Sequence, residues 1–385
     1  MRLPTDDVRL ARQALLHAGE PGDWSLTRFV AANGPVEAVR RLWSGDDPAK
    51  DGRHAARLRA ADVERELERA DAAGARLVCP EDPEWPTWLL DGLFDPPGPG
   101  DVDGGGVPYA LWVRGPLVLA DAVARAVAVV GARASTAYGE HTATELASDI
   151  SDQGWTVVSG AAYGIDGAAH RATMAVGGTT VAVLAGGVDD AYPRGHRALL
   201  DRVAESGLVV SELPLSEHPT RSRFLERNRI IAALSRGTVA VEMALRSGAA
   251  NTLGHTQRLC RHVMTVPGPV TSPLSAGCHR WVQDEKASLV CDASDVLALV
   301  APLGEVVEPD RRGALRPTDA LDPDALQVYD ALPARASVPM AGLAELARLP
   351  ATETGDALRV LLMVGLVEVA KGAVRRSPPT RRGGP

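Results

Sequence analysis

Lysine is scarce in this 385-residue chain: it supplies three of the 41 basic side chains, and arginine supplies the others. Aromatic residues make up 4% of the sequence, and no apolar run approaches the ~18 residues of a membrane helix. The first residues include Asp6 and Asp7 and lack the apolar core of a secretory signal. Four scattered cysteines without a CxxC pair exclude a zinc knuckle and a disulfide framework. We therefore expect a cytoplasmic protein without a membrane partner.

The net charge of −8 argues at first against a nucleic-acid partner. However, residues 77–107 hold seven acidic side chains and no basic one, so this stretch accounts for most of the excess. Residues 221–236, by contrast, hold five arginines and one acid, Glu226. Because phosphate binding depends on the local potential, the total charge does not exclude a polynucleotide ligand.

Changes in composition divide the chain into segments. Residues 1–76 have helical periodicity, with a long charged helix over Arg57–Ala73, and predict a helical domain similar to SAM or helix-hairpin-helix domains. Residues 77–107 predict an acidic linker rich in proline and glycine, within which Asp95–Gly106 has the composition of a flexible insertion. Residues 301–320 predict a second linker, and residues 377–385 predict a disordered tail.

The central segment, residues 108–300, alternates short apolar runs with helical stretches. The runs are Ala126–Val130, Trp155–Val158, Thr180–Leu184, Leu208–Ser211, Val239–Val241 and Val263–Val266, and the first helices are expected over about Gly139–Gln153, Asp166–Val176 and His196–Ala204. Continuous apolar runs that precede helices are typical of parallel strands buried on both faces. The segment therefore predicts an α/β fold, an extended Rossmann-like doubly wound parallel sheet.

The last segment, residues 321–376, has a different pattern. Helical stretches are expected over Pro323–Ala331, Val338–Arg348 and Thr352–Val364, followed by a β-hairpin that turns at Lys371-Gly372. Three helices followed by a hairpin are typical of a winged-helix domain.

Functional groups are expected beyond the carboxyl ends of the parallel strands. After the first run the chain reads Gly131-Ala132-Arg133-Ala134-Ser135: the glycine allows a sharp turn, the next helix offers N–H groups to an anion, and Arg133 adds a guanidinium. After the second run come Ser159, Gly160 and Tyr163, and no acid stands where a dinucleotide site needs one for the ribose. The GxGxxG pattern is also missing, so we predict no NAD site and no cofactor.

Asp166 and His170 are four residues apart on one helix face. They could form an acid–base or metal-binding pair, or Asp166 could cap the helix and hold a structural histidine. We favour the structural interpretation, because no further ligand stands at metal spacing nearby.

A second basic segment opens a helix and contains Arg223, Phe224, Arg227, Asn228 and Arg229. Clustered guanidiniums bind phosphates, and an exposed aromatic ring can stack on an unpaired base. The alternative is an arginine-rich solvent face with Phe224 in the core. Further along, Arg246-Ser247-Gly248 precedes another helix, which is suited either to phosphate or to an ordinary helix cap.

Several segments, in this order, resemble the DNA-processing protein A family (DprA, also called Smf). They are Val129 to Arg133, Ser159-Gly160 through Gly164-Ile165-Asp166 to His170, Leu184 to Gly187 with Tyr192-Pro193, Ser211-Glu212, Phe224 to Ile231, Val241-Glu242 with Ser247-Gly248, and Val266-Pro267-Gly268 with Thr271 to Gly277. The resemblance covers about residues 108–292, and its strength lies in the ordered set of segments. Two departures are Tyr163, where an arginine is common, and Ala249 to Thr252, where a Ser-Leu-Ile-Thr type of stretch is usual.

This resemblance implies a homodimer that binds single-stranded DNA and loads the RecA recombinase onto it, in recombination or natural transformation. Arg133 and residues 223–229 would line the DNA groove, Ser135 would lie beside them, and Ser159, Gly160, Ser247 and Gly248 would add backbone and hydroxyl contacts. Tyr163 could stack on a base. The resemblance also implies a protein that is not an enzyme.

Three other functions remain open. The same superfamily resembles lysine-decarboxylase-like nucleotide hydrolases, and a related nucleotide-sensing protein is a further possibility. The hydrolases use a Pro-Gly-Gly-x-Gly-Thr signature. This chain does not reproduce it at Val266-Pro267-Gly268-Pro269 or at Gly186-Gly187. A winged-helix transcription regulator that uses the α/β domain as a sensor is the third hypothesis.

Overall fold

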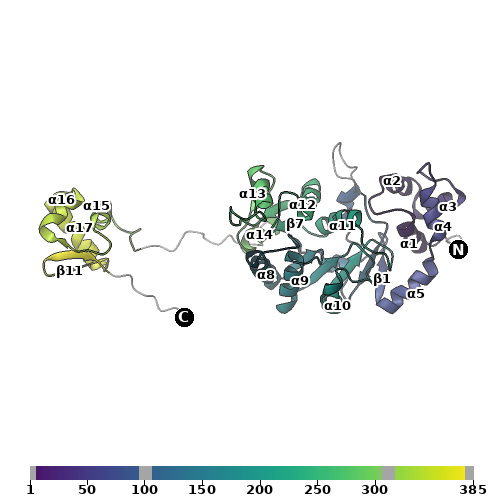
Figure 1. The fold of residues 1–385 in the computed structure, drawn as a ribbon, viewed down its shortest axis with the longest axis horizontal. Helices are drawn as coiled ribbons and strands as arrows, with labels where there is room; N and C mark the ends of the chain where they lie inside the picture. The colour runs from purple at the N-terminus through teal and green to yellow at the C-terminus, as the bar shows by residue number, and fades with distance from the viewer. Residues whose placement is uncertain (1–5, 95–105, 303, 306–316, 378–385) are drawn as a thin grey trace. The chain divides into compact units, whose positions relative to one another are not determined.

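A computed structural model of the chain describes residues 6–94, 106–302, 304–305 and 317–377 (Figure 1). The chain forms two compact units, residues 1–308 and residues 309–385. The expected insertion at Asp95–Gly106 and the expected tail lie outside the described residues, apart from Gly106 and Ser377. Within the described ranges, no helix is long and apolar enough to cross a membrane.

The first unit is built on a nine-stranded sheet, which confirms the predicted α/β class. The strands are β1 (Ala75–Val78), β2 (Leu111–Arg114), β3 (Ala126–Val130), β4 (Thr156–Ser159), β5 (Thr180–Val183), β6 (Leu208–Ser211), β7 (Gly237–Ala240), β8 (His262–Thr265) and β9 (Ser288–Leu289). Strands β3 to β9 pair in parallel, whereas β1 and β2 extend the β6 edge in antiparallel register. The predicted apolar runs therefore coincide with the strands to within two residues.

The strand order is β1-β2-β6-β5-β4-β3-β7-β8-β9, so the winding of the sheet reverses at β3. The chain proceeds from β3 to β4 on one side and later returns to place β7 on the other side. At such a switch point the loops after the two neighbouring strands diverge and leave a crevice.

Helices cover both faces of this sheet (Figure 1). Helices α8 (Ala137–Asp152), α9 (Ile165–Ala175) and α14 (Ala293–Val300) pack on one face, and α11 (Arg221–Ala233) and α12 (Gly248–Arg258) pack on the other. In β3, Val127 and Val129 face the first group, and Ala126, Ala128 and Val130 face the second. Both faces of β3 are buried, which explains why its sequence is a continuous apolar run. Two further helices are α10 (Arg197–Ser206) and α13 (Ala276–Gln283).

The N-terminal helices belong to the same unit as the sheet. They are α1 (Val8–Ala18), α2 (Trp24–Asn33), α3 (Pro35–Ser44), α4 (Arg53–Ala60) and α5 (Val63–Ala73), and the short α6 (Thr87–Leu90) and α7 (Leu119–Ala122) follow. The expected single helix over Arg57–Ala73 is wrong: Ala61 ends α4, and the Asp62 side chain accepts a hydrogen bond from Arg65 N to begin α5. Leu16 and Ala70 pack in one cluster with Trp112 of β2, which joins these helices to the sheet edge.

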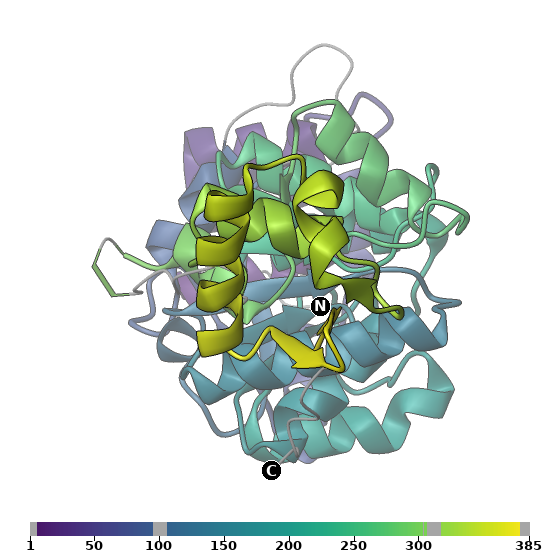
Figure 2. The same ribbon diagram turned by 90° about the vertical axis from the view of Figure 1, so that its left-hand side faces the viewer.

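The second unit has its own small core. It contains α15 (Pro323–Ala331), α16 (Leu343–Ala347), α17 (Ala351–Met363) and a sheet of β10 (Val338–Pro339), β12 (Ala373–Arg376) and β11 (Val367–Ala370), in that order (Figure 2). The helix expected over Val338–Arg348 is shorter than predicted, because Val338 and Pro339 pair with β12. The hairpin turns at Lys371-Gly372 as expected, and the assignment as a winged helix stays a prediction.

Candidate nucleic-acid interface

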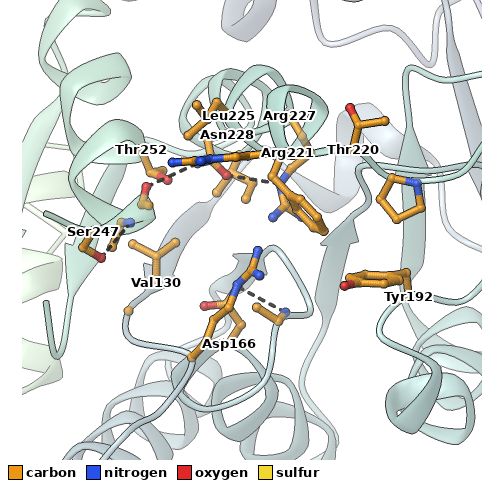
Figure 3. Close-up of a pocket in the computed structure, with 18 of the residues that line it drawn as sticks. Val130, Asp166, Tyr192, Thr220, Arg221, Leu225, Arg227, Asn228, Ser247 and Thr252 are labelled. Atoms are coloured by element: carbon orange, nitrogen blue, oxygen red, sulfur yellow. Dashed lines mark hydrogen bonds between the residues drawn. The ribbon is translucent and has the colours of Figure 1, made fainter. Parts of the chain in front are cut away.

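A pocket of about 770 Å³ lies at the switch point of the sheet (Figure 3). Val130 and Gly131 line it from the end of β3, Arg246 to Ala249 line it after β7, and one side of α11 closes it. Figure 3 shows Val130 and Ser247 on one side, Tyr192 on the opposite side, and Asp166 across from the labelled α11 residues. This position is the one that the strand order favours for a ligand.

The charge that lines this pocket is mainly positive. Arg133, Arg221, Arg227 and Arg246 line it together with a single acid, Asp166. Arg133, Arg221 and Arg246 are exposed, and none of these three forms an ion pair with a residue that the structure describes. Their guanidiniums are therefore available to an anionic ligand.

Phe224 lies beside two of these four arginines. The guanidinium carbon of Arg133 is 4.6 Å from the centroid of the Phe224 ring, and that of Arg227 is 5.9 Å away. The centroid of the Tyr192 ring is 5.5 Å from that of Phe224. The structure thus brings together Arg133 and Arg227, which lie far apart in the sequence, around one half-buried aromatic ring.

Arg227 and Asn228 hold the walls of the pocket. Arg227 is 7% exposed, and its Nη1 donates hydrogen bonds to the carbonyl oxygens of Gly160, at 2.8 Å, and Val183. Because burial penalises the charged form, it lowers the pKa of Arg227 to about 10. Asn228 Nδ2 donates to Gly248 O at 3.3 Å and to Asn251 Oδ1 at 3.0 Å. Both side chains line the pocket while they fix its backbone.

The start of α12 forms another part of the lining. Ser247 caps the helix by accepting a hydrogen bond from Ala249 N at 3.2 Å, and both residues line the pocket together with the exposed Gly248. The first turn of a helix has a positive electrostatic potential, which favours an anion beside Ser247 and Gly248.

The structure does not bring Arg223 and Arg229 into this pocket. Arg223 Nε lies 2.8 Å from Glu20 Oε2, and its Nη1 lies 2.6 Å from Glu217 Oε2. The hydrogen bond to Glu20 raises the pKa of Arg223 above its ordinary value. Arg229 is 1% exposed, and its Nη2 donates to both carboxylate oxygens of Glu212 at 2.6 Å. Both guanidiniums already have carboxylate partners.

Four other predicted contacts lie outside the lining of the pocket. Ser135 Oγ donates to Glu140 Oε1 at 2.9 Å, and the buried Ser159 Oγ donates to Val129 O at 2.6 Å. The carbonyl of Gly160 accepts from Arg227, as described above. Tyr163 is 49% exposed, and its ring meets that of His196 edge-on, with 4.7 Å between the centroids.

The anion expected at the start of α8 is a side chain of the protein itself. The Glu242 carboxylate accepts hydrogen bonds from Thr136 N at 2.9 Å and Thr136 Oγ1 at 2.6 Å. A side chain at Gly139 would collide with this carboxylate, since an added Cβ would lie 2.3 Å from Glu242 Oε2. The prediction of a free phosphate site there is wrong, because the Glu242 carboxylate occupies it.

Asp166 and His170 are both buried, but each has its own partners. Asp166 Oδ2 accepts from Gly160 N at 3.2 Å and from Ala162 N at 3.4 Å, whereas His170 Nδ1 pairs with Thr180 Oγ1 at 2.7 Å. The interpretation that Asp166 holds His170 is therefore wrong. No cluster of metal-ligating side chains occurs among the described residues.

The sequence argument did not single out Arg221, Arg246 or Tyr192 as contacts, although all three line the pocket. Arginine is so common in this chain that its presence alone indicates little. Their position at the starts of helices could have indicated a contact with an anion. Arg221 begins α11, and Arg246 precedes Ser247, the cap of α12.

Comparisons with known proteins agree on one family. Residues 76–301 match the family model described as DNA recombination-mediator protein A. A protein of Mycobacterium tuberculosis named "Putative DNA processing protein DprA" is 43% identical over 96% of this chain and 95% of its own length. The solved structure of DprA from Streptococcus pneumoniae has a TM-score of 0.63 at 29% identity and covers 75% of this chain and 96% of that one. Another solved structure is described as showing the single-stranded DNA binding mode of DNA processing protein A from Helicobacter pylori. It has a TM-score of 0.50 at 23% identity, and the match covers 59% of this chain and 96% of that one.

Proposed function

This chain belongs to the DNA recombination-mediator protein A family, and on that basis we propose that it binds single-stranded DNA at the pocket between β3 and β7. The observation that carries the proposal is the set of three exposed arginines that line one pocket together with Phe224 and have no carboxylate partner among the described residues. Such a surface binds phosphates and stacks bases without reading their sequence.

The site residues take two roles in this proposal. Arg133, Arg221 and Arg246, with the first turn of α12 at Ser247 and Gly248, bind phosphates. Phe224 and the exposed Tyr163 offer rings to unpaired bases.

The remaining predicted residues shape or support the site through their contacts with other residues of the protein. Arg227 and Asn228 shape the pocket and Arg227 adds charge, while Ser159 and Gly160 set the loop after β4. Ser135, Arg223 and Arg229 hold neighbouring segments through their own partners, so they support the site without bonding to the strand.

We also propose that the bound strand is protected and passed to the RecA recombinase, that a homodimer does this work, and that it does so in the cytoplasm. The description of the family as a recombination mediator supports the transfer step. The four cysteines are free, which fits a reducing compartment. We propose binding without catalysis, because the described lining of the pocket holds no cysteine, histidine or lysine.

The proposal is tested by fluorescence anisotropy with labelled oligothymidylate and with duplex of equal length, over a series of salt concentrations. Arg133→Ala and Arg246→Ala together should weaken single-strand binding and lower the slope of log affinity against log salt by about 0.7 for each lost phosphate contact. Arg40→Ala, on α3, is the control, because Arg40 pairs with Asp6 and does not line the pocket. An unchanged slope in the double variant contradicts the assignment of this surface.

A further inference from the structure

The pocket is divided chemically in a way that phosphate binding does not explain. Its exposed rim carries Arg133, Arg221 and Arg246, whereas its interior holds the Asp166 carboxylate beside the buried Arg227. Asp166 is 6% exposed and lies across the pocket from α11 (Figure 3). The charge of Arg227 offsets that of Asp166, so the interior attracts a phosphate less than the rim does, and it also presents a hydrogen-bond acceptor.

The Asp166 carboxylate is held in place and still has capacity to accept. Asp166 lies in the first turn of α9, and Gly160 N and Ala162 N both donate to its Oδ2. Gly131 N adds a further backbone interaction. A carboxylate can accept about four hydrogen bonds, so one acceptor position remains for a ligand. Burial raises the pKa of Asp166, and the nearby Arg227 opposes this rise by favouring the charged form.

The part of a nucleotide that suits such an acceptor is the base. Each natural base carries at least one N–H donor on its Watson–Crick edge, and proteins that hold an unstacked base read this edge by hydrogen bonds. The volume of about 770 Å³ accommodates a nucleotide, and Phe224 with Tyr192 supplies aromatic surface beside it.

We propose that Asp166 is a specificity-determining residue, whose carboxylate accepts a hydrogen bond from the Watson–Crick edge of one unpaired base in the pocket. This inference rests on the proposed binding of single-stranded DNA at the same site. In a duplex every Watson–Crick edge is already paired, so the Asp166 carboxylate distinguishes unpaired from paired DNA. Because all four bases offer a donor, the contact requires an unpaired base and does not require a particular sequence.

The test compares two oligonucleotides of equal length, one of thymine and one of 2-pyrimidinone. Thymine has a single Watson–Crick donor, N3–H, and 2-pyrimidinone has none and is no larger. The unmodified protein should bind the thymine oligomer about tenfold more tightly, the size expected for one hydrogen bond to a charged group. Asp166→Asn should reduce this ratio to about twofold or less, because the amide can donate to the pyrimidinone ring nitrogen.

Glu242→Gln is the matched control. Glu242 is also a buried carboxylate at a strand end, but it does not line the pocket, so its substitution should leave the ratio unchanged. Equal binding of the two oligomers by the unmodified protein overturns the inference, whether or not Asp166→Asn folds, and leaves single-strand binding intact. If Asp166→Asn weakens both oligomers by the same factor, Asp166 is only a positioning residue. If neither oligomer binds, the proposed function itself fails.

Discussion

At the scale of single residues, the partner of each arginine decides what that arginine can do. Arg229 and Arg133 have the same side chain, but Glu212 neutralises the first and no described carboxylate neutralises the second. The sequence predicted that Arg133 lies near Arg223, Arg227 and Arg229, and of these three only Arg227 shares the Phe224 ring with it. It could not predict that Arg223 pairs with Glu20, because these residues are 203 positions apart and no local pattern links them.

This difference predicts opposite outcomes for two substitutions. Arg229→Ala should destabilise the fold by about 3–5 kcal/mol, because it leaves the largely buried Glu212 carboxylate, which is 10% exposed, unpaired. Arg133→Ala should cost less than about 1 kcal/mol of stability and should lower the salt slope of strand binding. Urea denaturation measures the first effect and anisotropy the second. If the folded part of an Arg229→Ala preparation also binds the strand with a lower salt slope than the unmodified protein, this division of roles is contradicted.

At the scale of elements, short-range patterns predicted strands well and helix ends less well. The apolar runs located β3 and β6 to the residue, because strands buried on both faces leave a continuous signal. The break at Ala61 between α4 and α5 was missed, because the local sequence is helical on both sides and an aspartate cap decides the boundary. The sequence predicted where the loops after the strands lie, but it did not predict what occupies them. The Glu242 carboxylate, which follows β7, occupies the start of α8.

A buried histidine joins two of the N-terminal segments. His54 Nε2 lies 2.9 Å from Asp23 Oδ2, at the cap of α2, and its Nδ1 lies 2.8 Å from Asp47 Oδ1. Burial alone would lower the pKa of His54, but the hydrogen bonds to the two carboxylates outweigh it and raise the pKa. In the same way, burial would raise the pKa of Asp23 and of Asp47, but their hydrogen bonds outweigh it and lower both.

These directions define a pH window for stability. The contribution of His54 is complete below its ordinary pKa and is lost as the pH rises through its raised pKa, whereas the contribution of the carboxylates is lost only in acid. His54→Gln should therefore cost about 2 kcal/mol near pH 6 and less near pH 9. Urea denaturation followed by circular dichroism checks this, with the exposed His262→Gln as control. A cost in stability that does not change with pH would show that His54 is not charged between Asp23 and Asp47.

At the scale of the whole molecule, the pocket and the C-terminal helices belong to different units. The pocket lies entirely within residues 1–308, and the second unit has its own core around Val328, Leu343 and Leu361. Composition predicted a polar linker near the boundary, since proline and acidic residues mark it. Composition could not indicate that the N-terminal helices pack on the sheet edge, because that contact depends on residues as distant as Leu16 and Trp112.

The division predicts that a fragment of residues 1–308 folds alone and binds oligothymidylate within about twofold of the full chain. Calorimetry should show that the fragment keeps the unfolding transition of the first unit, and anisotropy measures its affinity. A loss of more than about tenfold in a folded fragment would assign part of the strand-binding surface to the second unit.

The reversal of strand order at β3 also has a consequence for biosynthesis. The two lips of the pocket, Gly131 and Ser247, come from opposite halves of the sheet, and β4, β5, β6 and β7 lie between them in the chain. A polypeptide that has left the ribosome only as far as β6 contains Gly131 but not yet Ser247, so only one side of the pocket exists. Under the proposed function, DNA binds only after β7 is in place, and because only the finished sheet has both lips, a bound strand should raise the melting temperature of the native protein.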